Sequence, residues 1–212
     1  MAVYLGNKKI SLKSGYTSGG GGGGMKAFFE AGGKCGWSTF TDLTGILQYN
    51  DTENVTDMSS MFYHCRYLTT IPLLNTSNVT NMLSMFASCG NLLEVPLFDI
   101  SKVVNTTDYG LIGMFAECTS LKEIPAFDVS NAKNLDSIFS GCSGLTAIHM
   151  TGMKVSLDIS ASTNFTHEAL LEILNNLGSA ASGQILTMGR ENLKKLTYDD
   201  KKIAKDKGWT LE

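Results

Sequence analysis

Residues 54–72 read Asn-Val-Thr-Asp-Met-Ser-Ser-Met-Phe-Tyr-His-Cys-Arg-Tyr-Leu-Thr-Thr-Ile-Pro, and residues 78–96 read Asn-Val-Thr-Asn-Met-Leu-Ser-Met-Phe-Ala-Ser-Cys-Gly-Asn-Leu-Leu-Glu-Val-Pro. Two further copies follow, and each of the four repeats contains one cysteine at the same position. These cysteines are Cys65, Cys89, Cys118 and Cys142. The steps between them are 24, 29 and 24 residues, because the longer step carries a five-residue insertion. Internal similarity at such a period is typical of repeat architectures, so the repeat decides the fold.

Each repeat has two halves with different periodicities. In the first half, apolar residues fall at helical spacing, which predicts a short amphipathic helix. In the first repeat they are Val55, Met58, Met61, Phe62 and Cys65. The second half, Leu-x-x-Ile-Pro, predicts a brief strand, or rung, that ends where proline removes a hydrogen-bond donor. Because one repeat cannot bury its apolar face alone, we expect an α/β leucine-rich-repeat solenoid with one short helix and one short parallel strand per repeat.

A third block links each rung to the next repeat. It reads Leu74–Ser77, Phe98–Ser101, Phe127–Ser130 and Leu157–Ser160. Its serine and the residue after it, such as Ser77 and Asn78, supply oxygens suited to cap the helix that follows.

The C-terminal part departs from the repeat, and we expect it to close the stack as atypical capping repeats. Thr166 is the predicted N-cap of a helix that runs to Leu177 and stops before Gly178. Residues 184–188 predict another extended rung. A last helix, from about residue 197 to residue 207, then leads into a closing strand.

The N-terminal part contains six consecutive glycines, Gly19–Gly24, a run that ordinarily forms a flexible linker. Residues 2–13 alternate apolar and polar residues, which predicts a strand that pairs with the sheet edge of another chain. We therefore expect three parts. They are an N-terminal anchor and glycine-rich tether at residues 1–25, the solenoid at residues 26–160 and the C-terminal capping repeats at residues 161–212.

Composition and charge narrow the classes of partner. The chain has 17 Lys and Arg against 20 Asp and Glu, a net charge of −3, without basic runs. Nucleic acid is therefore not an expected partner. The opening residues lack the apolar core of a secretory signal, and no long apolar run occurs. We expect neither conventional export nor membrane insertion.

The residue types that often bind metals or catalyse reactions in other proteins are predicted to be structural in this chain. Five cysteines form an odd set without a Cys-x-x-Cys pair, and their helical offset predicts buried thiols in the core. The three histidines, His64, His149 and His167, lie in different contexts without partners at metal-ligand spacing. The chain contains no nucleophile elbow, phosphate-binding loop or zinc-binding helix motif. We predict no catalytic residues, no cofactor and no metal.

The motif Asn-Val-Thr-x-Met-x-x-Met-Phe-x-x-Cys followed by Leu-x-x-Ile-Pro resembles the BspA-like leucine-rich repeat over residues 50–160. That family is found in bacterial surface proteins and in proteins of phages that infect gut bacteria. Residues 196–211 look like a cap attached to such repeats, and the opening Ala2-Val-Tyr-Leu-Gly-Asn-Lys looks like the start of phage virion proteins. The resemblance implies binding to cell surfaces or proteins without catalysis.

The candidate binding residues are the variable positions of the rungs, because stacked strands share one face. They are Tyr67, Thr69, Thr70, Asn91, Glu94, Lys122, Glu123 and Thr146. Their hydroxyl, amide and charged groups suit glycan or protein recognition equally, and an ordinary solvated face is the competing interpretation.

The leading hypothesis is a non-enzymatic phage virion protein, a fibre or decoration protein located in the virion. Its N-terminal segment would bind other virion proteins, its solenoid would contact a glycan or protein of the host surface, and a homo-oligomer is left open. The alternative is an adhesion or protein-interaction module at the bacterial cell surface.

Overall fold

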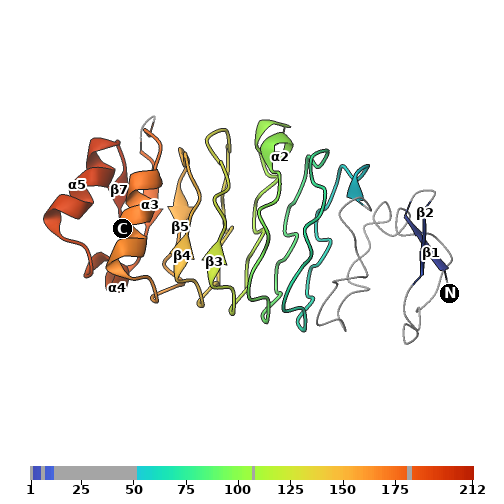
Figure 1. Ribbon diagram of the computed structural model, residues 1–212. Helices are drawn as coiled ribbons and strands as arrows, with labels where there is room; N and C mark the ends of the chain where they lie inside the picture. The colour runs from blue at the N-terminus through green and yellow to red at the C-terminus, as the bar shows by residue number, and fades with distance from the viewer. Residues whose placement is uncertain (1, 6–7, 12–51, 107, 181–182) are drawn as a thin grey trace.

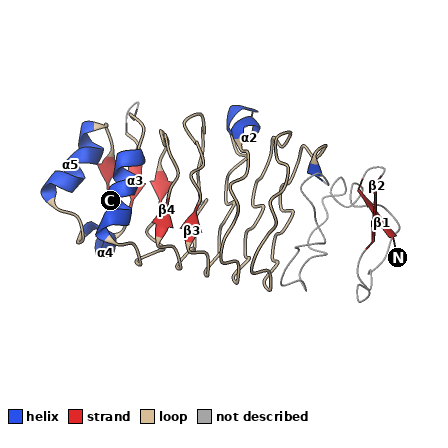
Figure 2. Cartoon of the chain, in the orientation of Figure 1, coloured by secondary structure: helices blue, strands red, loops and turns tan. Residues whose placement is uncertain are grey.

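The computed structural model describes residues 2–5, 8–11, 52–106, 108–180 and 183–212 of the 212-residue chain. Successive passes of the chain lie side by side from the first described repeat to the C-terminal helices (Figure 1). Figure 2 shows that loops and turns make up most of each pass through the four repeats, whereas helices are concentrated at the C-terminal end. Within the described part, no helix is both long and apolar enough to cross a membrane. The chain is mixed α/β, with short helices and short parallel strands, as the sequence predicts.

The prediction of a helix in the first half of each repeat is wrong, because this half is a series of tight turns. Its N–H groups alternate between two kinds of acceptor. Some bond to the carbonyl three residues back, as the Met61 N–H does to Met58 O at 3.1 Å. Others bond to the next repeat, as the Phe62 N–H does to Met85 O at 2.8 Å. An α-helix would instead direct its N–H groups to carbonyls four residues back in the same segment.

Left-handed residues explain why no helix forms here. Ser60 has φ 54° and His64 has φ 61°, a region that costs an L-residue about 1–2 kcal/mol and interrupts a right-handed helix. The same two positions are left-handed in all four repeats. They are filled by Ser60, Ser84, Gly113 and Ser137, and by His64, Ser88, Glu117 and Gly141. The three- and four-residue apolar spacing therefore comes from stacked turns.

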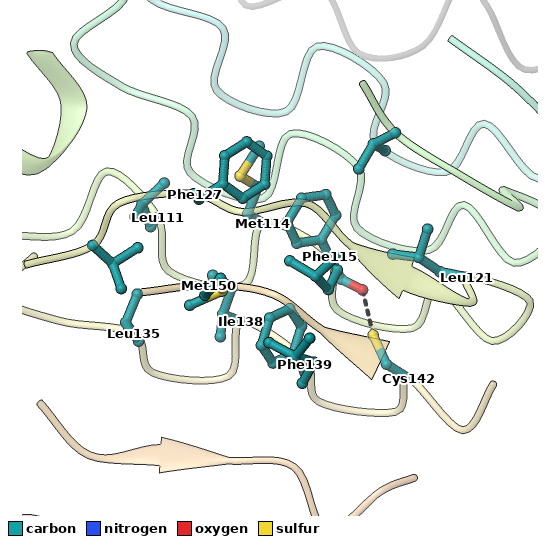
Figure 3. Close-up of a cluster of buried hydrophobic side chains, with 14 of the residues drawn as sticks. Leu111, Met114, Phe115, Leu121, Phe127, Leu135, Ile138, Phe139, Cys142 and Met150 are labelled. Carbon is teal, nitrogen blue, oxygen red and sulfur yellow. Dashed lines mark hydrogen bonds between the residues drawn. The ribbon is translucent and has the colours of Figure 1, made fainter. Parts of the chain in front are cut away.

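The turns place equivalent apolar side chains on top of one another in the core. The rings of Phe62, Phe86, Phe115 and Phe139 stack nearly in parallel, with centroids 5.3, 5.7 and 6.1 Å apart from one repeat to the next. Each of these rings is essentially inaccessible to solvent. Burying one phenylalanine side chain contributes roughly 1.5–3 kcal/mol, so this column is a main source of stability. Figure 3 shows the part of the core between the third and fourth repeats.

The rungs are extended, and one residue decides where they become strands. β3 (Glu123–Ile124) and β4 (Ala147–Ile148) pair in parallel, and the His149 N–H donates to Ile124 O at 3.0 Å. His149 stands at the position that is proline in the other repeats, namely Pro72, Pro96 and Pro125. Since proline has no N–H, Pro96 and Pro125 cannot donate the equivalent bond to the rung before them, and the rungs that end in Pro72 and Pro96 are extended without forming β-strands.

After each rung the chain turns at an Asp–Ser pair or, in the first repeat, at Asn75 and Ser77. The Ser101 N–H donates to Asp99 Oδ1 at 2.9 Å, and the Ser130 N–H donates to Asp128 Oδ1 at 2.9 Å. Hydrogen bonds from these serines lower the pKa of Asp99 and of Asp128. α2 (Ser101–Thr106) begins at the serine of the Phe98–Ser101 block, between Cys89 and Cys118, where the repeat carries its five-residue insertion, and it projects from the row of repeats (Figure 1).

The C-terminal helices begin at the predicted caps. α3 (His167–Asn176) starts after Thr166, whose hydroxyl accepts from the Ala169 N–H at 3.2 Å. α5 (Tyr198–Asp206) starts after Thr197, which exchanges hydrogen bonds with Asp200 in a capping box. Two strands also follow the prediction, namely β6 (Ile185–Thr187) and β7 (Thr210–Leu211). β5 (Leu157–Asp158), in the third block, was not predicted as a strand, and the three form a parallel sheet in the order β5, β6, β7.

Two further features of this part were not predicted. α4 (Arg190–Leu193) is a single short turn of helix between β6 and α5. Lys207 extends its ammonium to three carbonyls at the end of α3, including Leu177 O at 2.8 Å. This contact satisfies carbonyl groups that a helix C-terminus otherwise leaves without partners.

At the N-terminus, β1 (Ala2–Leu5) and β2 (Lys8–Ser11) form an antiparallel hairpin in which Val3 lies opposite Ile10. The prediction of one strand over residues 2–13 is therefore corrected to two strands paired with each other. The glycine run Gly19–Gly24 and Cys35 lie outside the described residues.

Candidate binding face

The eight candidate residues fall into three columns that run across the repeats. Thr69, Lys122 and Thr146 belong to one column, whose fourth member is Leu93. Backbone hydrogen bonds join its members in order. They are Leu93 N–H to Thr69 O at 2.9 Å, Lys122 N–H to Leu93 O at 3.2 Å and Thr146 N–H to Lys122 O at 2.8 Å. The structure therefore brings these positions side by side, and we call the eight predicted residues with Leu93 the ladder face.

The other two columns flank this one. Thr70, Glu94 and Glu123 occupy one, and the register of β3 with β4 places Ala147 next to Glu123. Tyr67 and Asn91 occupy the other, which continues with small residues in the third and fourth repeats. Those residues are Ser120 and Gly144.

Exposure differs along the ladder face. Tyr67 is 59% exposed, and Asn91, Glu94, Lys122 and Glu123 are exposed as well. Thr69, Thr70 and Thr146 are half-buried, and the Thr146 hydroxyl donates to Lys122 O at 3.1 Å. The sequence analysis did not include Leu93, because leucine in a rung was expected to point into the core. In the structure Leu93 is 47% exposed. The face thus mixes charged, polar and apolar groups.

His149 closes the ladder face at its C-terminal end. Its Nδ1 lies 2.6 Å from Glu172 Oε1 on α3, and its Nε2 lies 4.0 Å from Glu123 Oε2. The sequence placed His149 apart from any partner, because Glu172 lies 23 residues away and only the fold brings it near. A second histidine–carboxylate pair joins His167 Nε2 to Asp200 Oδ2 at 2.9 Å and holds α3 against α5.

The four described cysteines are buried free thiols, as predicted, and their chemistry is that of the core. Burial raises the pKa of the Cys142 thiol to about 12 and raises the pKa of Cys118 as well. A thiol that stays protonated at neutral pH is a poor nucleophile and a poor metal ligand. Within the residues that the structure describes, no three His, Cys, Asp or Glu side chains are placed to share a metal ion.

Comparison with known proteins returns one family. The model of the family described as "Mycoplasma protein of unknown function, DUF285" matches residues 27–152. This family is associated with BspA-like repeat proteins. No curated protein and no solved structure matches the chain.

Proposed function

Because the chain belongs to the DUF285 family, whose function is not known, we propose a role from the geometry itself: a non-enzymatic binding module built as a solenoid. In this proposal the turns and rungs serve as a scaffold, and the ladder face contacts the partner.

Hydrogen bonding between neighbouring repeats supports the solenoid. The turns of the first repeat donate to those of the second, as from Ser60 N–H to Leu83 O at 2.8 Å, and the second donates to the third, as from Ser84 N–H to Ile112 O at 3.0 Å. Side chains continue the pattern, since Thr80 Oγ1 donates to Thr56 O at 3.1 Å. Repeats that contact only their neighbours in this way form extended stacks with continuous surfaces.

One observation carries the binding role. Along the rungs, the first inward position is leucine in all four repeats, whereas the outward position directly after it changes from repeat to repeat. The inward leucines are Leu68, Leu92, Leu121 and Leu145, all fully buried. The column next to them on the ladder face holds threonine, leucine, lysine and threonine. A scaffold explains the constant set, and recognition of a specific partner explains why the outward set is chemically mixed.

The test compares two variants with matched charge. E94K/K122E reverses two charges on the ladder face. E191K/K194E reverses the pair formed by Glu191 of α4 and Lys194 directly after it, whose Oε1 and Nζ atoms lie 2.7 Å apart. Fluorescently labelled full-length chains are applied to an array of bacterial and animal polysaccharides and to a panel of purified surface proteins. We expect at least one ligand whose binding falls tenfold or more with the ladder-face variant only. Equal signals from all three chains contradict the proposal.

Two proposals for where the chain acts follow from the sequence. In the first, the N-terminal hairpin docks the chain on other virion proteins. A two-stranded hairpin is marginally stable alone, which supports a role for a partner sheet. In the second, the module acts at a bacterial cell surface, and the bacterial genus in the family's description supports it. Mass spectrometry of purified phage particles and of washed envelopes of uninfected cells distinguishes them, because the chain should be found in one of the two.

A further inference from the structure

The exposed apolar side chains gather on two neighbouring rungs. Among the described residues, six large hydrophobic side chains are exposed, and four of them lie within residues 67–73 and 91–97. They are Tyr67, Leu73, Leu93 and Leu97. Single exposed leucines are common on protein surfaces, whereas a contiguous group marks an interaction site.

Leu73 and Leu97 occupy equivalent positions in these rungs, each directly after the rung's proline. They are 48% and 57% exposed. The bond from Leu93 N–H to Thr69 O holds the two rungs side by side. The third repeat continues the line with an exposed alanine. We call the line the proline ridge, and it consists of Pro72, Leu73, Pro96, Leu97, Pro125 and Ala126.

The proline ridge ends in the fourth repeat. Met150, the equivalent of Ala126, is 1% exposed, and His149, which replaces the proline, is paired with Glu172 of α3. The exposed line thus covers three repeats and stops where α3 packs on the stack. It borders the ladder face, because Glu94 and Glu123 lie three residues before Leu97 and Ala126.

Carboxylates line both sides of the ridge. Glu94 and Glu123 precede it, and Asp99 and Asp128 follow it by two residues. All four are exposed. Residues 91–101 and 120–130 contain these four acidic side chains and one basic side chain, Lys122. Lys102 and Lys154 partly offset Asp99 and Asp128 from neighbouring segments.

Resting on the proposed binding role, we propose that the proline ridge docks a segment of a partner protein whose apolar side chains are flanked by lysine or arginine. Leucine and proline offer an aliphatic surface that suits aliphatic side chains, and a hydroxyl-rich glycan gains little from it. The flanking carboxylates complement basic residues, and such complementarity sets specificity and association rate. The inference thus favours a protein partner over a glycan for this edge of the ladder face.

The first experiment uses two synthetic twelve-residue peptides, one alternating Leu with Lys and one alternating Leu with Glu, each titrated against the full chain by fluorescence anisotropy. We expect the Leu-Lys peptide to bind and the Leu-Glu peptide to bind at least tenfold more weakly. L73S/L97S should weaken Leu-Lys binding at least tenfold. Both leucines are about half exposed, so this variant retains the core. Equal affinity of the wild type and L73S/L97S overturns the proposal.

Two variants that each lose two carboxylates distinguish binding at the proline ridge from general attraction of a basic peptide to an acidic chain. E94Q/D99N removes two carboxylates beside the ridge and keeps the turn, because Asn75 makes the equivalent bond to the Ser77 N–H at 3.2 Å. E191Q/D199N removes two carboxylates from the C-terminal helices. Only E94Q/D99N should weaken Leu-Lys binding and flatten its salt dependence between 50 and 300 mM NaCl. Equal weakening by both variants overturns the proposal.

Methyl NMR of the wild-type chain then locates the peptide. Shifts of the Leu73 and Leu97 methyl signals support the ridge, and shifts confined to other leucines overturn it. The outcome for the ridge is separable from that for the ladder face. If E94K/K122E abolishes binding on the array while L73S/L97S does not affect the peptide, the binding role stands and the ridge inference fails.

Discussion

Cys142 Sγ donates a hydrogen bond to the carbonyl oxygen of Phe115, 2.9 Å away in the preceding repeat (Figure 3). Cys118 makes the same contact to Phe86 O at 3.1 Å, and Cys89 to Phe62 O at 3.0 Å. The cysteine column therefore joins each repeat to the one before it through a buried donor. A small apolar residue of similar size would fill the space but would leave the carbonyl without this partner.

This relationship predicts slow thiol labelling in the native state. The pKa of Cys142 is raised to about 12, chiefly by burial, so the reactive thiolate is scarce at pH 8. In a C35S background, the native chain should react with Ellman's reagent at least a hundredfold more slowly than the urea-unfolded chain. Rapid reaction of any thiol without urea would contradict the burial of the column.

Substitution of Phe115 tests the aromatic column. Phe115 stacks between Phe86 and Phe139, with interplanar angles of 1° and 15°, and is fully buried. We expect F115A to lower the free energy of unfolding by about 3–5 kcal/mol, because it removes packing on both sides and leaves a cavity. Urea denaturation followed by circular dichroism measures this loss. Y109A, at an exposed site, serves as control and should change stability by less than about 0.5 kcal/mol.

The left-handed turn positions predict a stabilising substitution. Ser137 has φ 55°, and the equivalent residue of the third repeat is Gly113, with φ 59°. Since glycine adopts this conformation without steric cost, S137G should raise the free energy of unfolding by about 0.5–1 kcal/mol. S137V, with a branched side chain at the same φ, should lower it. A decrease in the urea midpoint of S137G would show that the serine side chain contributes more than its backbone strain costs.

The sequence predicts the repeat, the Phe and Cys columns and the caps at Thr166 and Thr197, because each depends on residues at a fixed spacing or within one turn. It does not distinguish a helix from stacked turns, because both place apolar residues three and four apart. The distinguishing signal is conformational: Ser60 and Ser84 adopt a left-handed φ that serine rarely shows.

The candidate site was predictable to a similar degree. The rung positions of Thr69, Lys122 and Thr146 follow from the repeat alone. Leu93 was overlooked because leucine at a rung suggests the core. The contact of His149 with Glu172 and the exposure of Leu73 and Leu97 depend on how α3 and the rungs pack, which no local pattern encodes.

His149 allows a test of how the rung is paired. Its backbone N–H donates to Ile124 O, and its side chain contacts Glu172. H149P removes both and should lower the free energy of unfolding by about 2–4 kcal/mol. H149Q keeps the N–H, so it should lose only about 0.5–1.5 kcal/mol. Thermal unfolding by circular dichroism compares them, and equal losses would mean that the backbone bond contributes nothing to the pairing of β3 with β4.

The contact between His167 and Asp200 predicts how the C-terminal helices respond to acid. The hydrogen bond from His167, followed by those from Thr197, lowers the pKa of Asp200 from 3.8 to about 2. A carboxylate whose pKa is lower in the folded state stabilises the fold above its unfolded pKa, and this contribution disappears as pH falls from about 4 towards 2. The wild type should therefore lose more stability than D200N between pH 5 and pH 2.5, as measured by urea midpoints. Because Asp200 also caps α5, D200N retains an acceptor for the Thr197 N–H and should still fold. Parallel pH profiles of the two chains would show that Asp200 titrates normally and that α3 and α5 are held together by other contacts.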